Sequence, residues 1–162
     1  MNVGRGWLCL AAAVLLGAAC GRAPRAGDWT AKAARHHAEI DRLLDGGDRP
    51  GARRRLASIL AEAPARPDEL QRALIQDAYF RLAELDLAER APAEAIAAAD
   101  VALALGGGRD VFAANLLVVR AAAHEALGHA EAALADYHRA LVINDALLAA
   151  TLHPVPPAAP SR

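Results

Sequence analysis

Glycine and proline divide the middle of the chain into six segments of helical length. The breaks fall at Gly46-Gly47-Asp48 with Pro50, between Pro64 and Pro67, just before Pro92, at Gly106-Gly107-Gly108, at Gly128, and at His153-Pro154. Glycine supplies the left-handed residue that ends a helix, and proline suits a first helical turn. Asp110 stands where its side chain can cap the helix after the triple glycine. The pattern predicts six helices joined by short connections.

The residues between these breaks favour helices over strands. Hydrophobic residues make up 55% of the chain but aromatic residues only 4%, because alanine supplies much of the apolar content. Alanine is the strongest helix former, and the β-branched and aromatic runs typical of strands are missing. Because alanine buries little area, such helices must approach closely to build a core. The sequence therefore predicts an all-α fold in one domain.

Residues 1–19 have the layout of an export signal. Arg5 and the free amine give a positive start, an apolar run extends from Trp7 to Gly17, and small residues lead into Cys20. The run is too short to cross a membrane, which favours a cleaved signal peptide. An uncleaved anchor is the alternative.

The segment Leu16-Gly17-Ala18-Ala19-Cys20 resembles the lipidation box of bacterial lipoproteins. That family prefers leucine three residues before the cysteine, where this chain has Gly17. The resemblance implies that Cys20 carries acyl chains such as palmitate and anchors the chain in the cell envelope. Because no Asp follows Cys20, it also implies the outer membrane, with the domain facing the periplasm. Ordinary secretion, with Cys20 left as a lone thiol, is the alternative.

Four regions follow from these patterns. We expect a signal peptide at 1–19, a lipidated cysteine and flexible tether at 20–30, a helical domain at 31–148, and a proline-rich disordered tail at 149–162. A proline-rich tail can also act as a peptide ligand, which is the alternative for the last region.

The six helices pair into three antiparallel hairpins. In the last pair, a small–aromatic–small pattern follows Gly128, at Ala133, Tyr137 and Ala140. These residues share one helical face, so small side chains let the next helix approach while the ring fills the gap. The same offsets recur at Ala95, Ala99 and Ala102, and at Ala52, Leu56 and Ile59.

This spacing resembles the second helix of a tetratricopeptide repeat. In the partner helix, Arg120 occupies a slot that is usually leucine and His124 one that is usually aromatic. Corresponding alanines lie 43 residues apart (52 to 95) and 38 apart (95 to 133), whereas the family repeat is about 34 residues. The resemblance implies three divergent repeats stacked as a short solenoid. A plain six-helix bundle is the alternative.

Few residues suggest catalysis, metal binding or nucleic-acid binding. His124 and His129 are five residues apart with a helix end between them, unlike the paired histidines of zinc proteases. The triple glycine lacks the Gly-Lys-Ser/Thr of a phosphate loop, and no serine elbow is present. The formal charge is −1, and the cluster at 53–55 is typical of a solvated helix face. We predict no enzyme activity, no cofactor, no metal site and no nucleic-acid partner.

Binding through a surface is the function that this pattern predicts. In stacked hairpins the first helix of each pair lines a concave face. The residues expected there are His37, Asp41, Asp77, Phe80, Glu84, Asn115, Val118 and Glu125. Their mix of acids and apolar groups suits an extended peptide or a helix. The predicted function is a membrane-anchored periplasmic adaptor that binds a protein or peptide. The alternatives are a structural helical bundle of the envelope and an accessory subunit of an envelope enzyme or secretion complex.

Overall fold

The all-α prediction is confirmed. The computed structural model describes residues 26–107 and 109–152, and within them it contains six helices and no strand. The helices are α1 (Ala26–Asp45), α2 (Arg49–Ala61), α3 (Glu69–Ala88), α4 (Pro92–Ala104), α5 (Val111–Ala126) and α6 (Ala130–Leu152). The predicted signal peptide and Cys20 lie outside the described residues.

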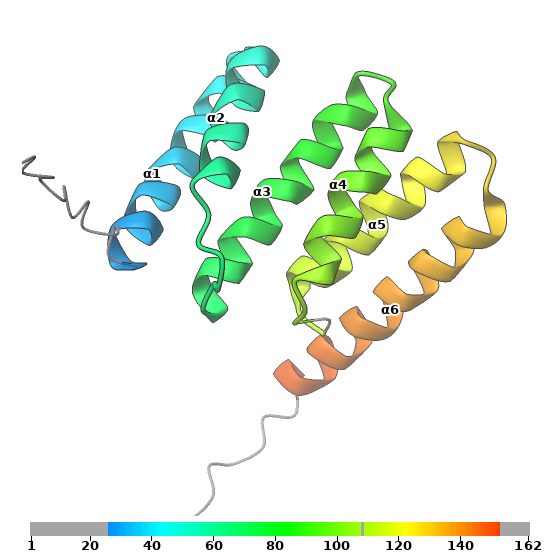
Figure 1. Cartoon of the computed structure of the whole chain (residues 1–162). Coiled ribbons are helices and arrows are strands. Elements are labelled where there is room, and N and C mark those ends of the chain that lie inside the picture. Colours follow the sequence, from blue (N-terminus) through cyan, green and yellow to red (C-terminus); the bar gives the residue numbers. More distant parts are fainter. Residues whose placement is uncertain (1–25, 108, 153–162) are drawn as a thin grey trace, which may run out of the picture.

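The six helices lie side by side in chain order (Figure 1). The helices pair into hairpins α1–α2, α3–α4 and α5–α6. The first helix of each hairpin contacts the first helix of the next, since α1 packs against α3 and α3 against α5. Within the described ranges the second helices α2, α4 and α6 make no such contacts with one another. The first helices therefore form one continuous layer, and all eight residues expected at the binding face lie on these helices.

Three hydrophobic clusters follow one another along this row. The first joins α1, α2 and α3 around Trp29, Ile40 and Leu56. The second joins α3, α4 and α5 and consists mostly of alanine, including the fully buried Ala95 and Ala99. The third joins α5 and α6. Alanine at the contacts lets helices approach closely, as the composition predicted.

All three hairpins close with the same turn. Each contains a residue with positive φ, at Gly47 (77°), Arg90 (61°) and Gly128 (77°). The next N–H donates to the carbonyl five residues back, from Asp48 to Leu43 at 2.8 Å, from Ala91 to Asp86 at 2.8 Å, and from His129 to His124 at 2.9 Å. This is the Schellman pattern of helix ends. The three turns repeat at the same intervals as the alanines at 52, 95 and 133.

Aspartates begin three of the helices. The Asp110 carboxylate accepts a hydrogen bond from the Ala113 N–H at 2.8 Å, which confirms the predicted cap of α5. Asp48 and Asp68 cap α2 and α3 in the same way. Pro92 opens α4, in the first turn where its missing N–H has no cost.

Both ends of the helical domain extend further than the sequence predicted. The first helix begins at Ala26, inside the segment 20–30 that was expected to be a tether. Trp29 is 7% exposed in the first core cluster, and burying its ring holds this turn of helix against α2 and α3. At the other end, α6 continues past 148 to Leu152. Residues 153–162 of the predicted proline-rich tail lie outside the described residues.

Tyr137 does not fill a gap between helices as predicted. Its ring is 37% exposed, whereas the equivalent Leu56 and Ala99 are fully buried. Those two residues lie in clusters that include the following hairpin, and the described residues contain no hairpin after α6. The two small residues of the small–aromatic–small pattern are buried as predicted, since Ala133 and Ala140 are 4% and 2% exposed.

Candidate functional site

Three of the predicted face residues meet between α1 and α3. His37 Nδ1 lies 2.8 Å from Asp77 Oδ2. Arg81 Nε donates to the same oxygen at 2.8 Å, and its Nη1 pairs with the Asp41 carboxylate. The pattern had singled out both acids and the histidine but not Arg81, which joins them. An arginine four residues after Asp77 on the same helix was the available signal.

The charges in this cluster stabilise one another. Burial raises the pKa of Asp77, but the hydrogen bond from His37 and the charge of Arg81 outweigh it and hold that pKa below its ordinary value. Arg81 has its pKa raised by Asp41 and Asp77, against the effect of its own burial. Both groups stay ionised at neutral pH. The cluster therefore ties α1 to α3 and leaves little free charge for a ligand.

Four other predicted residues line one open pocket between α3 and α5. Its volume is about 340 Å³, and its lining is Phe80, Glu84, Leu87, Asn115, Val118, Val119 and Ala122. The face that α3 and α5 present is thus hollowed where the sequence placed Phe80, Glu84, Asn115 and Val118. Phe80 also packs against the alanine-rich core cluster, so its ring serves both the core and the pocket wall.

Glu84 is the one charged group in the pocket lining. Partial burial raises its pKa, the nearby charge of Asp77 adds to the rise, and Arg81 opposes it. Within the described part of the chain, Glu84 makes no ion pair or hydrogen bond. A carboxylate that is partly desolvated and unpaired gains most from a cation supplied by a ligand.

Glu125, the eighth predicted residue, lies away from this pocket. Its carboxylate accepts a hydrogen bond from the Tyr137 hydroxyl at 3.2 Å, across the seam between α5 and α6. The pocket lining ends at Ala122, one turn before it. Glu125 therefore contributes to the packing of the last hairpin and not to the α3–α5 pocket.

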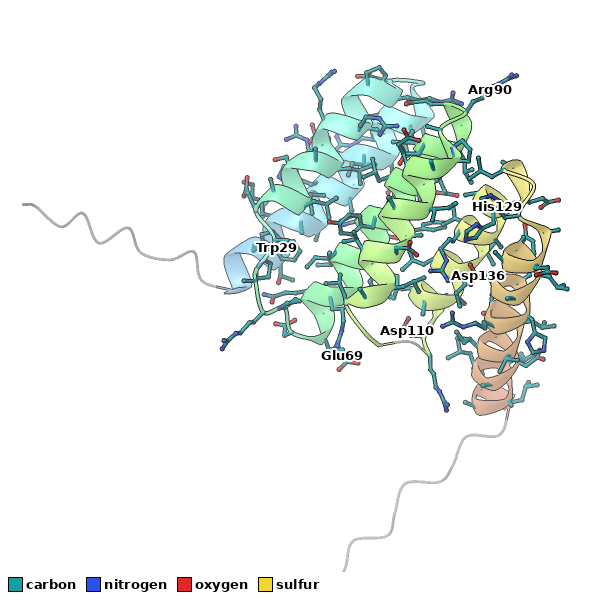
Figure 2. All side chains as sticks on the ribbon, turned by 45° about the vertical axis from the view of Figure 1, so that its right-hand side comes forward. Trp29, Glu69, Arg90, Asp110, His129 and Asp136 are labelled. Atoms are coloured by element: carbon teal, nitrogen blue, oxygen red, sulfur yellow. The ribbon has the colours of Figure 1, made fainter. Side chains whose placement is uncertain are left out.

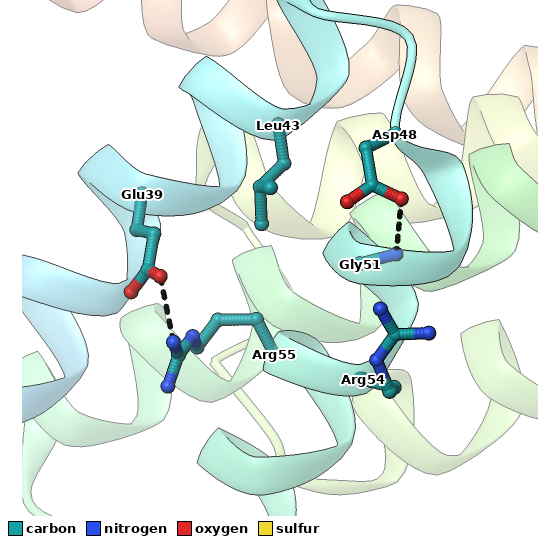
Figure 3. Close-up of a pocket in the computed structure, with 6 residues that line it drawn as sticks. All are labelled: Glu39, Leu43, Asp48, Gly51, Arg54 and Arg55. Carbon is teal, nitrogen blue, oxygen red and sulfur yellow. Dashed lines mark hydrogen bonds and ion pairs between the residues drawn. The ribbon is translucent and has the colours of Figure 1, made fainter.

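A second pocket of about 320 Å³ lies between α1 and α2 (Figure 3). Three of its four charged lining residues are already engaged, because Arg55 donates to Glu39 at 2.6 Å and Asp48 caps α2 through the Gly51 N–H. Arg53 directly precedes the pocket residues Arg54 and Arg55 in the sequence. Its guanidinium pairs with the Asp86 carboxylate on α3 at 2.7 Å. Two arginines of the 53–55 cluster thus hold helices together, whereas the sequence suggested a solvated face.

His124 and His129 come closer than their spacing suggested. Their Nδ1 atoms are 3.4 Å apart and the ring centroids 5.7 Å apart. The Schellman turn between them brings residue 129 back beside residue 124, which the argument from a single helix face overlooked. No group of three or more His, Cys, Asp or Glu residues suited to a metal ion occurs in 26–107 or 109–152.

Comparisons of the chain with protein-family models, curated proteins and solved structures found no match. Among the helices described, none is both long enough and apolar enough to cross a membrane.

Proposed function

We propose that this chain is a binding module of the bacterial envelope, anchored through Cys20, which holds a protein or peptide segment in the pocket between α3 and α5. The observation that carries this proposal is the pocket itself. It combines an apolar wall with the unpaired, partly buried carboxylate of Glu84. On this proposal the chain acts by binding and not by catalysis.

The repeat architecture is part of the same proposal. Three divergent tetratricopeptide-like hairpins account for the shared turns and for the buried alanines at 52, 95 and 133, which are 0%, 0% and 4% exposed. They also account for the contacts between successive first helices. Repeats of this kind place their first helices along one surface, which is where the pocket lies.

The pocket chemistry suggests which peptide it would hold. Phe80, Leu87 and Val118 offer apolar contact for one large aliphatic or aromatic side chain. Glu84 offers an ion pair to a neighbouring lysine or arginine, and the Asn115 amide can both donate to and accept from a peptide backbone. We therefore expect a segment in which a large apolar residue stands next to a basic one.

A matched pair of variants tests this proposal. Val118 in the pocket and Val101 on α4 are the same residue type and are similarly exposed, at 42% and 48%. The full chain is expressed in a Gram-negative envelope, and its partners are captured from membrane extracts. We expect Val118→Asp to lose partners that the wild type and Val101→Asp both retain, because an apolar segment seated in the pocket would have to desolvate the new carboxylate.

Two further variants separate the parts of the pocket. Phe80→Ala removes the apolar wall, and Glu84→Gln removes the charge with little change of shape. Circular dichroism and thermal unfolding of each variant show whether the fold is retained. Unchanged capture by all three folded pocket variants contradicts the proposal.

A further inference from the structure

One side of α6 carries an exposed row of leucines. Leu134, Leu141, Leu148 and Leu152 are 71%, 57%, 58% and 64% exposed. The first three are seven residues apart, which places them on one face of the helix, in the spacing of a coiled-coil seam. Six of the eleven large hydrophobic residues that are exposed in the described ranges lie on α6. We call the four leucines the α6 stripe.

The preceding hairpin shows what normally covers this face. Ile96 and Leu103 on α4 occupy the positions of Leu134 and Leu141, counted from the shared turn. Both are partly buried, and both pack against the cluster that includes the next helix, α5. No helix follows α6 in the described residues. The stripe is thus a packing face without its partner, and an apolar surface of this kind marks a site of association.

A second copy of the chain fits this face better through its own α6 than through its α1. Within the described residues, α1 and α2 expose no large hydrophobic side chain, and the first such residue along the chain is Leu70. If α6 of one copy packed against α1 of another, the leucines would meet exposed alanines and arginines, such as Ala34, Ala38 and Arg35. Pairing of α6 with α6 sets leucine against leucine and closes as a two-fold dimer.

Two polar residues between the leucines of the α6 stripe favour an antiparallel over a parallel pair of α6 helices. His138 and Asp145 lie between the leucines and are exposed. In a parallel pair Asp145 would face Asp145 of the other copy, and like charges opposed in this way are unfavourable. In an antiparallel pair centred on Leu141, Leu134 lies opposite Leu148 of the other copy. Asp145 then lies beside His138 of that copy, which can donate to it.

We propose that two copies of this chain pair antiparallel through the α6 stripe, with Leu141 at the two-fold axis. This interface is separate from the α3–α5 pocket and does not depend on what the pocket binds. Pairing would leave that pocket open on both copies, because its lining residues belong to α3 and α5.

Photo-cross-linking of the full chain tests the interface. Two copies with different epitope tags are expressed together in a bacterial envelope, with a benzophenone amino acid at position 141 or, as a control, at position 101. We expect a product carrying both tags from position 141 and none from position 101. A product with a different protein, with residues 153–162 of the same copy, or no product at all overturns the proposal.

The site of linkage tests the direction. A probe at position 134 should link to the region of Leu148 in the other copy, and linkage to the region of Leu134 would overturn the antiparallel arrangement. Leu141→Glu brings two carboxylates together at the axis and should weaken the dimer by roughly 100-fold or more. Sedimentation of the detergent-solubilised chain should then show the dimer mass for wild type and Val101→Glu, and the monomer mass for Leu141→Glu. A dimer mass for all three contradicts the proposal.

Discussion

Arg90 stands where the other two hairpins have glycine, and replacing it with glycine should stabilise the fold. Its φ is 61°, in the left-handed region, while Gly47 and Gly128 have φ of 77° at the equivalent positions. Figure 2 shows Arg90 at the outer end of its turn. The side chain is exposed and makes no ion pair or hydrogen bond within the described residues, so Arg90→Gly removes no such contact.

The size of the effect follows from two opposing contributions. A left-handed conformation costs a residue with a Cβ roughly 1–2 kcal/mol, which glycine avoids. Glycine also gives the unfolded chain more freedom, which takes back roughly 0.4–1 kcal/mol. The net gain in the free energy of unfolding should be about 0.5–1 kcal/mol. For a domain of this size that corresponds to a rise in Tm of roughly 2–3 °C.

Urea and thermal unfolding followed by circular dichroism measure this gain. The reverse substitution is the matched control, because Gly128→Arg introduces the same strain into the last hairpin and should cost about 1 kcal/mol. If Arg90→Gly lowers the free energy of unfolding, or if Gly128→Arg leaves it unchanged, the equivalence of the three turns is wrong.

Three other substitutions test the contacts that hold the hairpins together. Arg120→Met should cost about 3 kcal/mol in urea unfolding, because it leaves the buried Asp136 without the guanidinium that donates to it twice at 2.7 Å, and a cost below about 1 kcal/mol would contradict this. Gly51→Ala places a Cβ 2.2 Å from Asp48 Oδ2 and should displace the cap at a cost of about 1 kcal/mol. That cost should vanish in the Asp48→Ala background, and a persistent cost would place the clash elsewhere. Asp77 has a pKa below its ordinary 3.8, so its stabilisation is present above about pH 4 and is lost as the pH falls through the lowered value. Asp77→Asn should therefore be least stable relative to wild type near neutral pH, and a gap that does not narrow on acidification would refute the assignment.

The six helices and several of their buried positions could be predicted from the sequence because local rules determine them. Glycine at Gly47 and Gly128 ends a helix by its backbone freedom, and Asp110 caps the next by its side chain. Ala52 and Ala95 marked the buried face because small residues at helical spacing permit close approach. Such signals are contained within a few residues of the chain.

Contacts between helices were harder to predict from the sequence. Arg120 seemed a misplaced polar residue in a leucine slot, yet it pairs with Asp136 on α6, and only the packed structure shows that partner. Figure 2 labels Asp136 on the last helix of the row. Trp29 lay in a stretch without apolar periodicity, so the burial of its ring against α2 and α3 gave no local sign. The break before Pro92 was predicted, but the left-handed conformation of Arg90 was not, because the rule expects glycine at such a position.

The lining of the α3–α5 pocket was partly predictable for the same reason. Helical spacing placed Phe80, Glu84 and Val118 on the faces that meet between α3 and α5. It did not show that the Glu125 carboxylate accepts a hydrogen bond from the Tyr137 hydroxyl on another helix. Spacing along a helix predicts the face of a side chain but not the partner that the face will meet.

Selection of peptides on the full exported chain tests the proposed function most directly. A displayed random-peptide library is selected against the wild type, and the enriched peptides are titrated against wild type, Val118→Asp and Val101→Asp. The proposed function predicts enrichment of peptides in which a large apolar residue adjoins lysine or arginine. They should bind wild type and Val101→Asp equally, and Val118→Asp roughly tenfold or more weakly. Peptides that bind all three proteins equally, or no enrichment at all, would contradict it.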